Sequence, residues 1–179
     1  PLRSVAMPSN AENAYESMKA REGQSEGTGE WFEVTQETIN AFADITHDHQ
    51  FIHVDPEKAA QLSPWKVPIA HGFLTLSLLT HLSGSIRQSG GGGAGGGGGG
   101  GGGMGAMTGM VMGVNYGFEK VRFINPVKVG SKIRASGVTK SVELKDPNNL
   151  QITRTLTVEI EGEDKPALVA DWITRVVFA

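Results

Sequence analysis

The chain has 179 residues, no cysteine and a formal net charge of −3, so we expect one domain with a core of ordinary size, in a reducing compartment such as the cytoplasm. The slight negative charge gives no broad cationic surface for nucleic acid, and the lack of thiols excludes disulfides, cysteine nucleophiles and zinc–cysteine sites. No apolar run approaches the roughly 20 residues that span a bilayer, and no basic segment followed by an apolar one opens the chain, so we expect neither membrane insertion nor export.

The first 29 residues differ in composition from the rest of the chain. Residues 1–29 are polar and rich in small side chains, and a short helix is expected around Asn10–Arg21. The stretch that follows the helix, up to Gly29, is expected to be irregular. We therefore expect an N-terminal arm that is partly helical, followed by a single domain over residues 30–179.

The domain is expected to begin with a short strand and three helices. Trp31–Val34 is typical of a strand, and Thr35 is placed to cap a helix that leads to a histidine-rich segment. The pair Asp55-Pro56 is typical of a helix start, with Asp as the cap and Pro at the first helical position. Phe73–Leu82 is apolar on most of its circumference, which predicts a helix that is buried on nearly every side.

A glycine tract separates this apolar helix from the second half of the chain. Thirteen of the 25 glycines lie between Gly90 and Gly103, interrupted only by Ala94. Because the tract has no side chains to bury, we expect a flexible insertion. It lacks the Lys-Ser/Thr ending of a phosphate-binding loop and does not lead from a strand into a helix, so we assign it no ligand.

The second half of the chain, from Val111, alternates with the period of two that is typical of strands. Long strands are expected around Val121 and over Ile133–Leu144, Ile152–Glu161 and Leu168–Phe178. A helix that is apolar all round is best buried by an antiparallel sheet that curls around it. The sequence therefore predicts an α+β hot-dog fold, and a helix packed on an open antiparallel sheet is the alternative.

The region of greatest chemical interest holds four of the five histidines. Asp48 and His53 lie five residues apart between two expected helices. A carboxylate and an imidazole so placed can both point at one water molecule, the carboxylate accepting its proton and the imidazole orienting it, as the addition of water to an activated alkene requires. A metal site built from His47, His49 and His53 is an alternative, although no His-Glu-x-x-His signature is present. Polar loop residues without a catalytic role are the third interpretation, and spacing alone leaves all three open.

Two segments, Phe42–Pro56 and Pro68–Leu79, carry a longer pattern. An Asp is followed five residues later by a His, and a His-Gly pair then opens an apolar helix. These segments resemble the hydratase-2 motif of the MaoC-like dehydratases, or (R)-specific enoyl-CoA hydratases, in their nodulation protein N-like branch. Asp48 and His53 match the two catalytic positions of the family. The sequence has His49-Gln50-Phe51 where many members have an Asn-Pro pair, and this changes neither catalytic position.

The resemblance implies a hot-dog enzyme that hydrates a trans-2-enoyl-CoA to the (R)-3-hydroxyacyl-CoA, reversibly and without a metal or redox cofactor. Asp48 and His53 are then expected to hold the attacking water molecule. The backbone N–H of Gly72, at the start of the apolar helix, is expected to stabilise the enolate oxygen.

Four further residues are candidates for supporting roles. Ser77 matches a family serine near the active site, and a hydroxyl bonded back to its own helix is the alternative. His71 is expected to brace the turn into the helix and to point away from the substrate. The block Gly113–Val127 also resembles the nodulation protein N-like branch, and within it Asn115 and Tyr116 are expected to shape either the acyl tunnel or only a strand end.

The expected partners are an acyl-CoA substrate and a second copy of the chain. Edge strands of a sheet invite pairing, and in this family two hot dogs pair to continue the sheet, which implies a homodimer or higher homo-oligomer. The alternatives are a dehydratase for a branched or dicarboxylic acyl-CoA and a hot-dog protein that binds acyl thioesters without catalysis.

Overall fold

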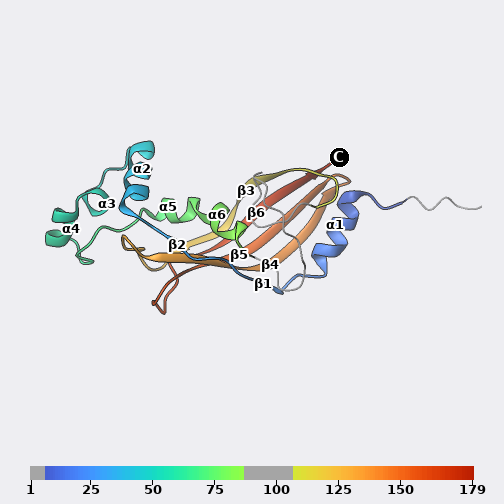
Figure 1. Ribbon diagram of the computed structural model, residues 1–179. Coiled ribbons are helices and arrows are strands. Elements are labelled where there is room, and N and C mark those ends of the chain that lie inside the picture. Colours follow the sequence, from blue (N-terminus) through green and yellow to red (C-terminus); the bar gives the residue numbers. More distant parts are fainter. Residues whose placement is uncertain (1–6, 87–106) are drawn as a thin grey trace, which may run out of the picture.

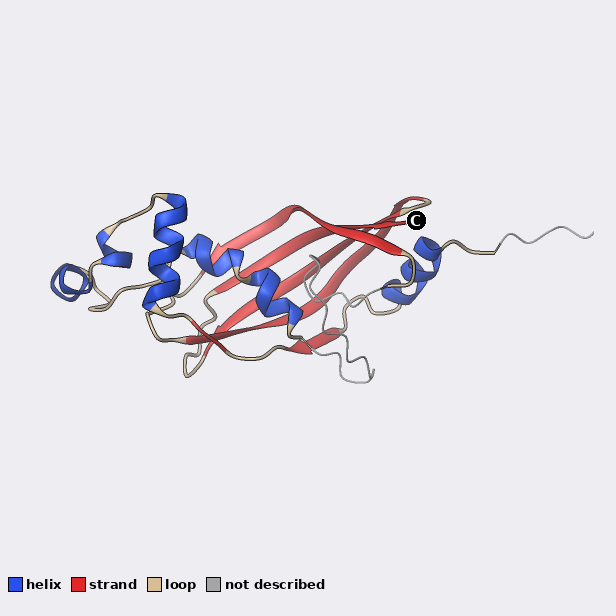
Figure 2. Cartoon of the chain, turned by 45° about the horizontal axis from the view of Figure 1, so that its top comes forward, coloured by secondary structure: helices blue, strands red, loops and turns tan. Residues whose placement is uncertain are grey.

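The computed structural model describes residues 7–86 and 107–179 (Figure 1). An antiparallel sheet carries α5 and α6 on one face, α1 lies at one end of the sheet, and α2, α3 and α4 lie beyond the other end (Figures 1 and 2). The helices are α1 Asn10–Lys19, α2 Gln36–Thr46, α3 Phe51–Val54, α4 Pro56–Leu62, α5 Gly72–Ser77 and α6 Leu79–Gly84. The strands are β1 Ser25–Thr28, β2 Phe32–Glu33, β3 Met110–Phe123, β4 Lys132–Asp146, β5 Asn149–Ile160 and β6 Leu168–Phe178.

The sheet has the strand order β1-β4-β5-β6-β3, and β2 pairs with β4 beside β1. All of these pairings are antiparallel. The strand β3 forms one edge of the sheet, because among the described strands it pairs with β6 alone. The predicted α+β architecture is therefore confirmed, and the four long strands lie where the alternation of apolar residues placed them.

The main core lies between the sheet and the pair α5–α6. Apolar side chains of these helices pack against alternate residues of β4, β5 and β6, which is why one face of each strand is apolar. A second, smaller core lies between α1 and the other end of the same sheet. The leading members of the main core are Leu74, Leu79, Leu82, Leu156, Leu168 and Trp172.

A largely buried ion pair between two strands lies where the two cores meet. The Arg154 side chain on β5 is 1% exposed, and its guanidinium pairs with the Glu26 carboxylate on β1. The Thr139 hydroxyl donates to the same carboxylate at 2.9 Å. Arg154 follows Ile152 of the second core and precedes Leu156 of the main core along the strand, so the ion pair lies where the two apolar clusters meet.

The apolar helix expected over Phe73–Leu82, which we call the central helix, differs from the prediction in two respects. It consists of two short helices with Leu78 between them, and the Ser77 hydroxyl donates to the Phe73 carbonyl at 2.7 Å. Such hydroxyl groups compete with the helix ladder and bend helices. The helix is also buried on one side only: Phe73 is 69% exposed, because the sheet of a single chain covers one face of it.

The N-terminal segment also differs from the prediction. The stretch expected to be irregular contains β1, whose residues pair with β4. This strand has no apolar alternation, because the side chain that attaches it to the sheet is the charged Glu26, which is 11% exposed. Hydrophobic periodicity cannot find such a strand. The strand predicted over Trp31–Val34 is shorter, comprising Phe32 and Glu33 alone. The glycine tract Gly90–Gly103 lies outside the described residues.

The predicted helix starts are confirmed. The Thr35 side chain accepts a hydrogen bond from the Thr38 N–H at the start of α2. The Asp55 carboxylate accepts from the Lys58 N–H at the start of α4, with Pro56 at the first position. In the part of the chain that the structure describes, every helix is too short or too polar to cross a membrane.

The buried ion pair generates a prediction about stability. Glu26→Ala leaves the Arg154 guanidinium buried without its carboxylate, and we expect a loss of about 3–5 kcal/mol in the free energy of unfolding, measured by urea denaturation. The exposed Glu16 on α1 supplies the control: Glu16→Ala should change this free energy by less than about 0.5 kcal/mol. Equal values for the two variants would contradict the structural role given to the pair.

Candidate active site

The loop that carries Asp48 leaves α2 by a left-handed residue. His47 ends the helix with φ of 60° and ψ of 22°, a conformation that turns the chain out of the helical path. The Asp48 side chain is 55% exposed, and its Oδ1 accepts the Gln50 N–H at 3.4 Å. The next side chain, His49, bonds through Nε2 to Asp44 Oδ1 on α2 at 2.8 Å, so the loop is tied back to the helix it follows.

His53 lies in the single-turn helix α3 and is 6% exposed. Its Nδ1 lies 2.7 Å from the carbonyl oxygen of Ile69. Because a carbonyl only accepts, Nδ1 carries the proton and Nε2 keeps a lone pair when the ring is neutral. Two more bonds hold α3: Gln36 Nε2 donates to the His53 carbonyl at 2.8 Å, and the Ile69 N–H donates to the Ile52 carbonyl at 2.9 Å.

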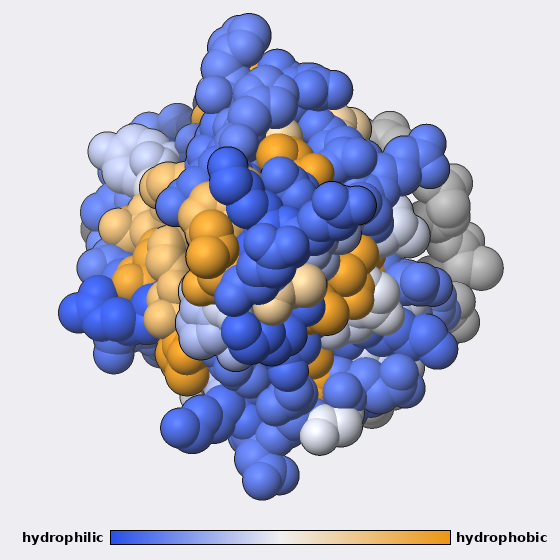
Figure 3. All heavy atoms as spheres, turned by 90° about the vertical axis from the view of Figure 1, so that its left-hand side faces the viewer, coloured by the Kyte–Doolittle hydropathy of each residue, from blue (hydrophilic) through white to orange (hydrophobic). Residues whose placement is uncertain are grey.

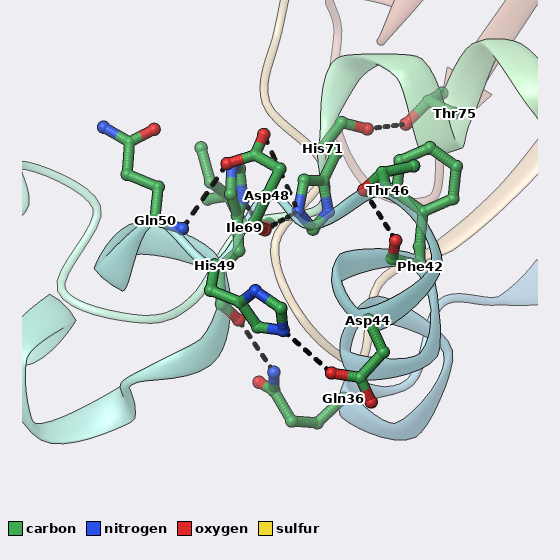
Figure 4. A network of polar contacts seen from close by, with 11 residues as sticks. Gln36, Phe42, Asp44, Thr46, Asp48, His49, Gln50, Ile69, His71 and Thr75 are labelled. Carbon is green, nitrogen blue, oxygen red and sulfur yellow. Dashed lines mark hydrogen bonds and ion pairs between the residues drawn. The ribbon is translucent and has the colours of Figure 1, made fainter.

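His71 lies against Asp48 (Figure 4) and also contacts His53. Its Nε2 donates to the backbone carbonyl of Asp48 at 2.9 Å, and its ring stacks on the ring of His53 with centroids 3.7 Å apart. The bond to the Asp48 backbone fits the bracing role expected for His71, and His71 is not among the residues that line the adjacent cavity. Its orientation relative to a substrate stays a prediction. The sequence alone could not predict this contact, because it joins two residues 23 positions apart. Helices α3 and α4 lie between them in the chain.

Asp48, His53 and His71 form one compact group. One carboxylate oxygen of Asp48 and one nitrogen of each ring all lie within 4.8 Å of one another. Two groups at that separation can both reach a single water molecule, since each hydrogen bond spans roughly 2.8 Å. The structure thus brings together the carboxylate and the imidazole that the sequence placed five residues apart.

Burial lowers the pKa of His53 below its ordinary value. The bond from Nδ1 to the Ile69 carbonyl acts in the opposite direction, the neighbouring His71 lowers the pKa further, and Asp48 raises it. Removal from water disfavours the charged ring and is the largest of these effects. At neutral pH the ring is accordingly neutral, and its Nε2 can accept a proton.

A cavity of about 260 Å³ adjoins His53. Its wall includes Gly72 and Thr75 of α5 and the ring of Phe123 at the end of β3. A Cβ atom at Gly72 would lie 3.1 Å from that ring, so glycine allows the close approach of helix and strand. In the described part of the chain no hydrogen bond uses the Gly72 N–H. The remaining lining residues are mostly apolar: Ile69, Ala70, Ile124, Asn125, Pro126, Val127 and Ala167.

Three predicted supporting residues do not lie at this cavity. Ser77 is exposed and its hydroxyl bonds to its own helix, which is the contact of the alternative interpretation. Asn115 and Tyr116 lie on β3 seven or eight residues before Phe123, roughly 25 Å away along an extended strand. The Tyr116 ring instead packs under the Arg175 guanidinium, 3.9 Å from its centroid.

Thr75 and Asn125 line the cavity and were missed by the sequence analysis. Thr75 lies three positions after Gly72 on α5, so helical spacing alone would have placed both residues on one side of the helix. Asn125 follows β3 and has no comparable signal in the sequence, because only the fold brings the end of that strand to the start of α5.

The metal alternative does not fit this geometry. Among the described residues, the histidine and carboxylate side chains close enough to share an ion are Asp48, His53 and His71, so His47 and His49 are not part of such a group. The two rings are stacked at an interplanar angle of 23°. Their lone pairs lie in nearly parallel planes, which prevents both from pointing at one ion about 2.0–2.1 Å away.

Comparison with known proteins identifies the family. The family model of the MaoC like domain matches residues 17–90. Nodulation protein N of Rhizobium leguminosarum bv. viciae is 45% identical over 159 residues, which cover 89% of this chain and 88% of that protein. The chain belongs to the MaoC-like dehydratase family. The family recognised from the motifs in the sequence is thereby confirmed.

Two other MaoC-like relatives bear on the fold and the chemistry. The 3-hydroxyacyl-thioester dehydratase Z of Mycobacterium tuberculosis (strain CDC 1551 / Oshkosh) is 42% identical over 160 residues, which cover 89% of this chain and 93% of that protein. The solved (R)-hydratase from A. caviae involved in PHA biosynthesis superposes with a TM-score of 0.58 at 21% identity, covering 82% of this chain and 94% of that one. The hot-dog fold of this MaoC-like chain is therefore confirmed.

The lowered pKa of His53 predicts how stability depends on pH. In the unfolded chain His53 takes up a proton near its ordinary pKa of about 6.5, whereas the folded chain resists protonation. The contribution of His53 to stability is therefore lost as the pH falls below that value. We expect the free energy of unfolding to decrease more between pH 7 and pH 5.5 in the wild type than in His53→Gln, measured by urea denaturation. An equal decrease in both proteins would contradict the assignment.

Proposed function

We propose that this MaoC-like chain catalyses the reversible (R)-specific hydration of a trans-2-enoyl-CoA, with Asp48 and His53 as the acid/base pair. The observation that carries the proposal is the group of a carboxylate and a neutral imidazole within 4.8 Å of one another, beside a cavity with mainly apolar walls. The identity of 42% to a 3-hydroxyacyl-thioester dehydratase supports the same chemistry.

In the proposed reaction Asp48 and His53 hold one water molecule. Nε2 of His53, which keeps its lone pair in the neutral ring, is proposed to remove a proton in place of the Asp48 carboxylate expected from the sequence, as the water oxygen forms its bond to C3 of the enoyl thioester. The electrons of the double bond move to the thioester oxygen and give an enolate. A proton held by the pair then reaches C2 on the same face, so hydrogen and hydroxyl are added and no cofactor is required.

The Gly72 N–H is the proposed donor to the enolate oxygen. Gly72 is one of the residues that line the cavity, and within the described residues no hydrogen bond uses its N–H. A donor that is already aimed at developing charge costs no reorganisation during the reaction. The apolar part of the wall is then free to receive the acyl chain.

The lining of the cavity also bears on the substrate class. Its described residues include no arginine or lysine, and the second carboxylate of a dicarboxylic acyl group would need such a partner when buried. The lining therefore favours an uncharged acyl chain.

The catalytic proposal is tested by the loss of crotonyl-CoA absorbance at the enoyl band. We expect Asp48→Asn and His53→Ala to lower kcat at least about 10²-fold, because each removes one member of the acid/base pair. Asp164→Asn, at an exposed carboxylate, is the matched control and should retain wild-type activity. An (R)-specific dehydrogenase should oxidise the product.

Two results of the same assay would contradict the proposal. Equal activity in all variants would remove Asp48 and His53 from the mechanism. A wild-type protein that is inactive on short, medium and long enoyl-CoAs would instead favour a specialised dehydratase or a protein that binds thioesters without catalysis.

We also propose that a second copy of the chain pairs along β3. Several exposed side chains of this edge strand are large and apolar, and apolar edge strands tend to pair with strands of other chains. Phe73 on α5 is a further large apolar side chain that one chain leaves exposed. Seen from the end formed by α2–α4, the surface is mostly hydrophilic, with several apolar patches (Figure 3). The exposed apolar residues of β3 include Val111, Met112, Val114, Tyr116 and Phe118.

A charged residue at this edge should weaken the pairing. Val114 is 44% exposed, and we expect Val114→Lys to shift the protein toward the 19.0 kDa mass of one chain in sedimentation velocity at micromolar concentration. Ile45→Lys is the control, because Ile45 is 79% exposed on α2 and lies away from the edge strand. A monomeric wild type, or the same mass for both variants, would contradict the pairing.

A further inference from the structure

We propose that His71 is a positioning residue for the acid/base pair, and that it acts by donating its Nε2–H to the main chain of Asp48. The inference rests on the proposed function of Asp48 and His53. It gives a task to a buried histidine that the proposed reaction does not itself use.

The contact distances distinguish positioning from proton transfer. His71 Nε2 lies 2.9 Å from the Asp48 carbonyl oxygen but 4.0 Å from the nearer oxygen of its carboxylate. The first distance is a hydrogen bond and the second is too long for one. The ring therefore fixes where the Asp48 backbone lies and does not itself occupy the carboxylate as a hydrogen-bond donor.

The Asp48 backbone benefits from such a tether because the other side-chain bond that ties its loop to α2, between His49 and Asp44, is exposed to water. The residue follows the left-handed end of α2, and its side chain is 55% exposed. His71 by contrast is 3% exposed at the start of the central helix. The hydrogen bond thus attaches an exposed loop to the buried part of the molecule. A shift of about 1 Å in a catalytic group can cost on the order of 10²-fold in rate.

The bond also assigns the tautomer of His71. The Asp48 carbonyl can only accept, so the proton lies on Nε2, and Nδ1 of the neutral ring keeps its lone pair. Nδ1 is buried and has no hydrogen-bond partner among the described residues. In the site His71 therefore donates through Nε2 alone, and the face of its ring packs on the ring of His53.

Two substitutions separate the donor from the ring. His71→Gln keeps an N–H near the position of Nε2 but loses the aromatic face, whereas His71→Phe keeps the aromatic face and loses the donor. If the donor positions Asp48, we expect His71→Phe to lower kcat for crotonyl-CoA at least about tenfold with KM changed less than about twofold. His71→Gln should stay within about threefold of the wild type. The same exchanges at the exposed His81 of α6 are the matched controls and should leave kcat unchanged.

The outcomes of the kinetic test are separable. Wild-type kcat in His71→Phe would overturn the proposal, and so would a His71→Gln protein that is folded yet as slow as His71→Phe. Thermal unfolding of each variant establishes that it is folded.

A second measurement needs neither substrate nor a variant that folds well. Two-bond ¹H–¹⁵N spectra of the labelled wild type should show His71 protonated at Nε2 and unprotonated at Nδ1. The Nδ1-protonated tautomer would overturn the proposal even if the protein is an active hydratase. Conversely, the expected tautomer in a protein that hydrates no enoyl-CoA would refute the proposed function and leave the contact standing.

Discussion

The site depends on a small set of hydrogen bonds between the Asp48–His53 loop and the segment that opens the central helix. Nδ1 of His53 donates to the Ile69 carbonyl, the Ile69 N–H donates to the Ile52 carbonyl, and Nε2 of His71 donates to the Asp48 carbonyl. Each bond satisfies a polar group that would be costly to leave unpaired away from water. Together they hold the Asp48 carboxylate and the His53 imidazole close to one another, which is the arrangement that the proposed acid/base chemistry requires.

The rest of the molecule holds the start of the central helix in the position that these hydrogen bonds require. The sheet and the main core hold α5 and α6 in place, and this fixes the start of α5 beside the end of β3. The cavity forms where these two elements meet, and the loop bonds aim His53 into it. One chain leaves the outer side of the central helix and the edge strand β3 exposed. The same surfaces that a single chain cannot bury are therefore those that a second copy is proposed to cover.

Much of this architecture could be predicted from the sequence, because local patterns determine it. Alternation located the long strands, and the caps at Thr35 and Asp55 located two helices. The strand β1 was missed because the side chain that attaches it to the sheet is the charged Glu26. The contact of His71 with the Asp48 backbone was not predicted, because it joins two segments that only the tertiary fold brings together. The break in the helix at Leu78 could have been expected from the hydroxyl residues around it. The exposure of one side of the helix could not be predicted, because burial depends on which other elements cover that side.

The central claim is that neutral His53 is the base that activates water. The most direct test compares the pH dependence of kcat/KM for crotonyl-CoA with the protonation of the His53 ring followed by NMR in the same protein. We predict that kcat/KM falls as the pH decreases, with the midpoint at which His53 becomes protonated, and that this midpoint lies below the ordinary value of about 6.5 because the ring is buried. Full activity at a pH where NMR shows His53 to be protonated would contradict the account.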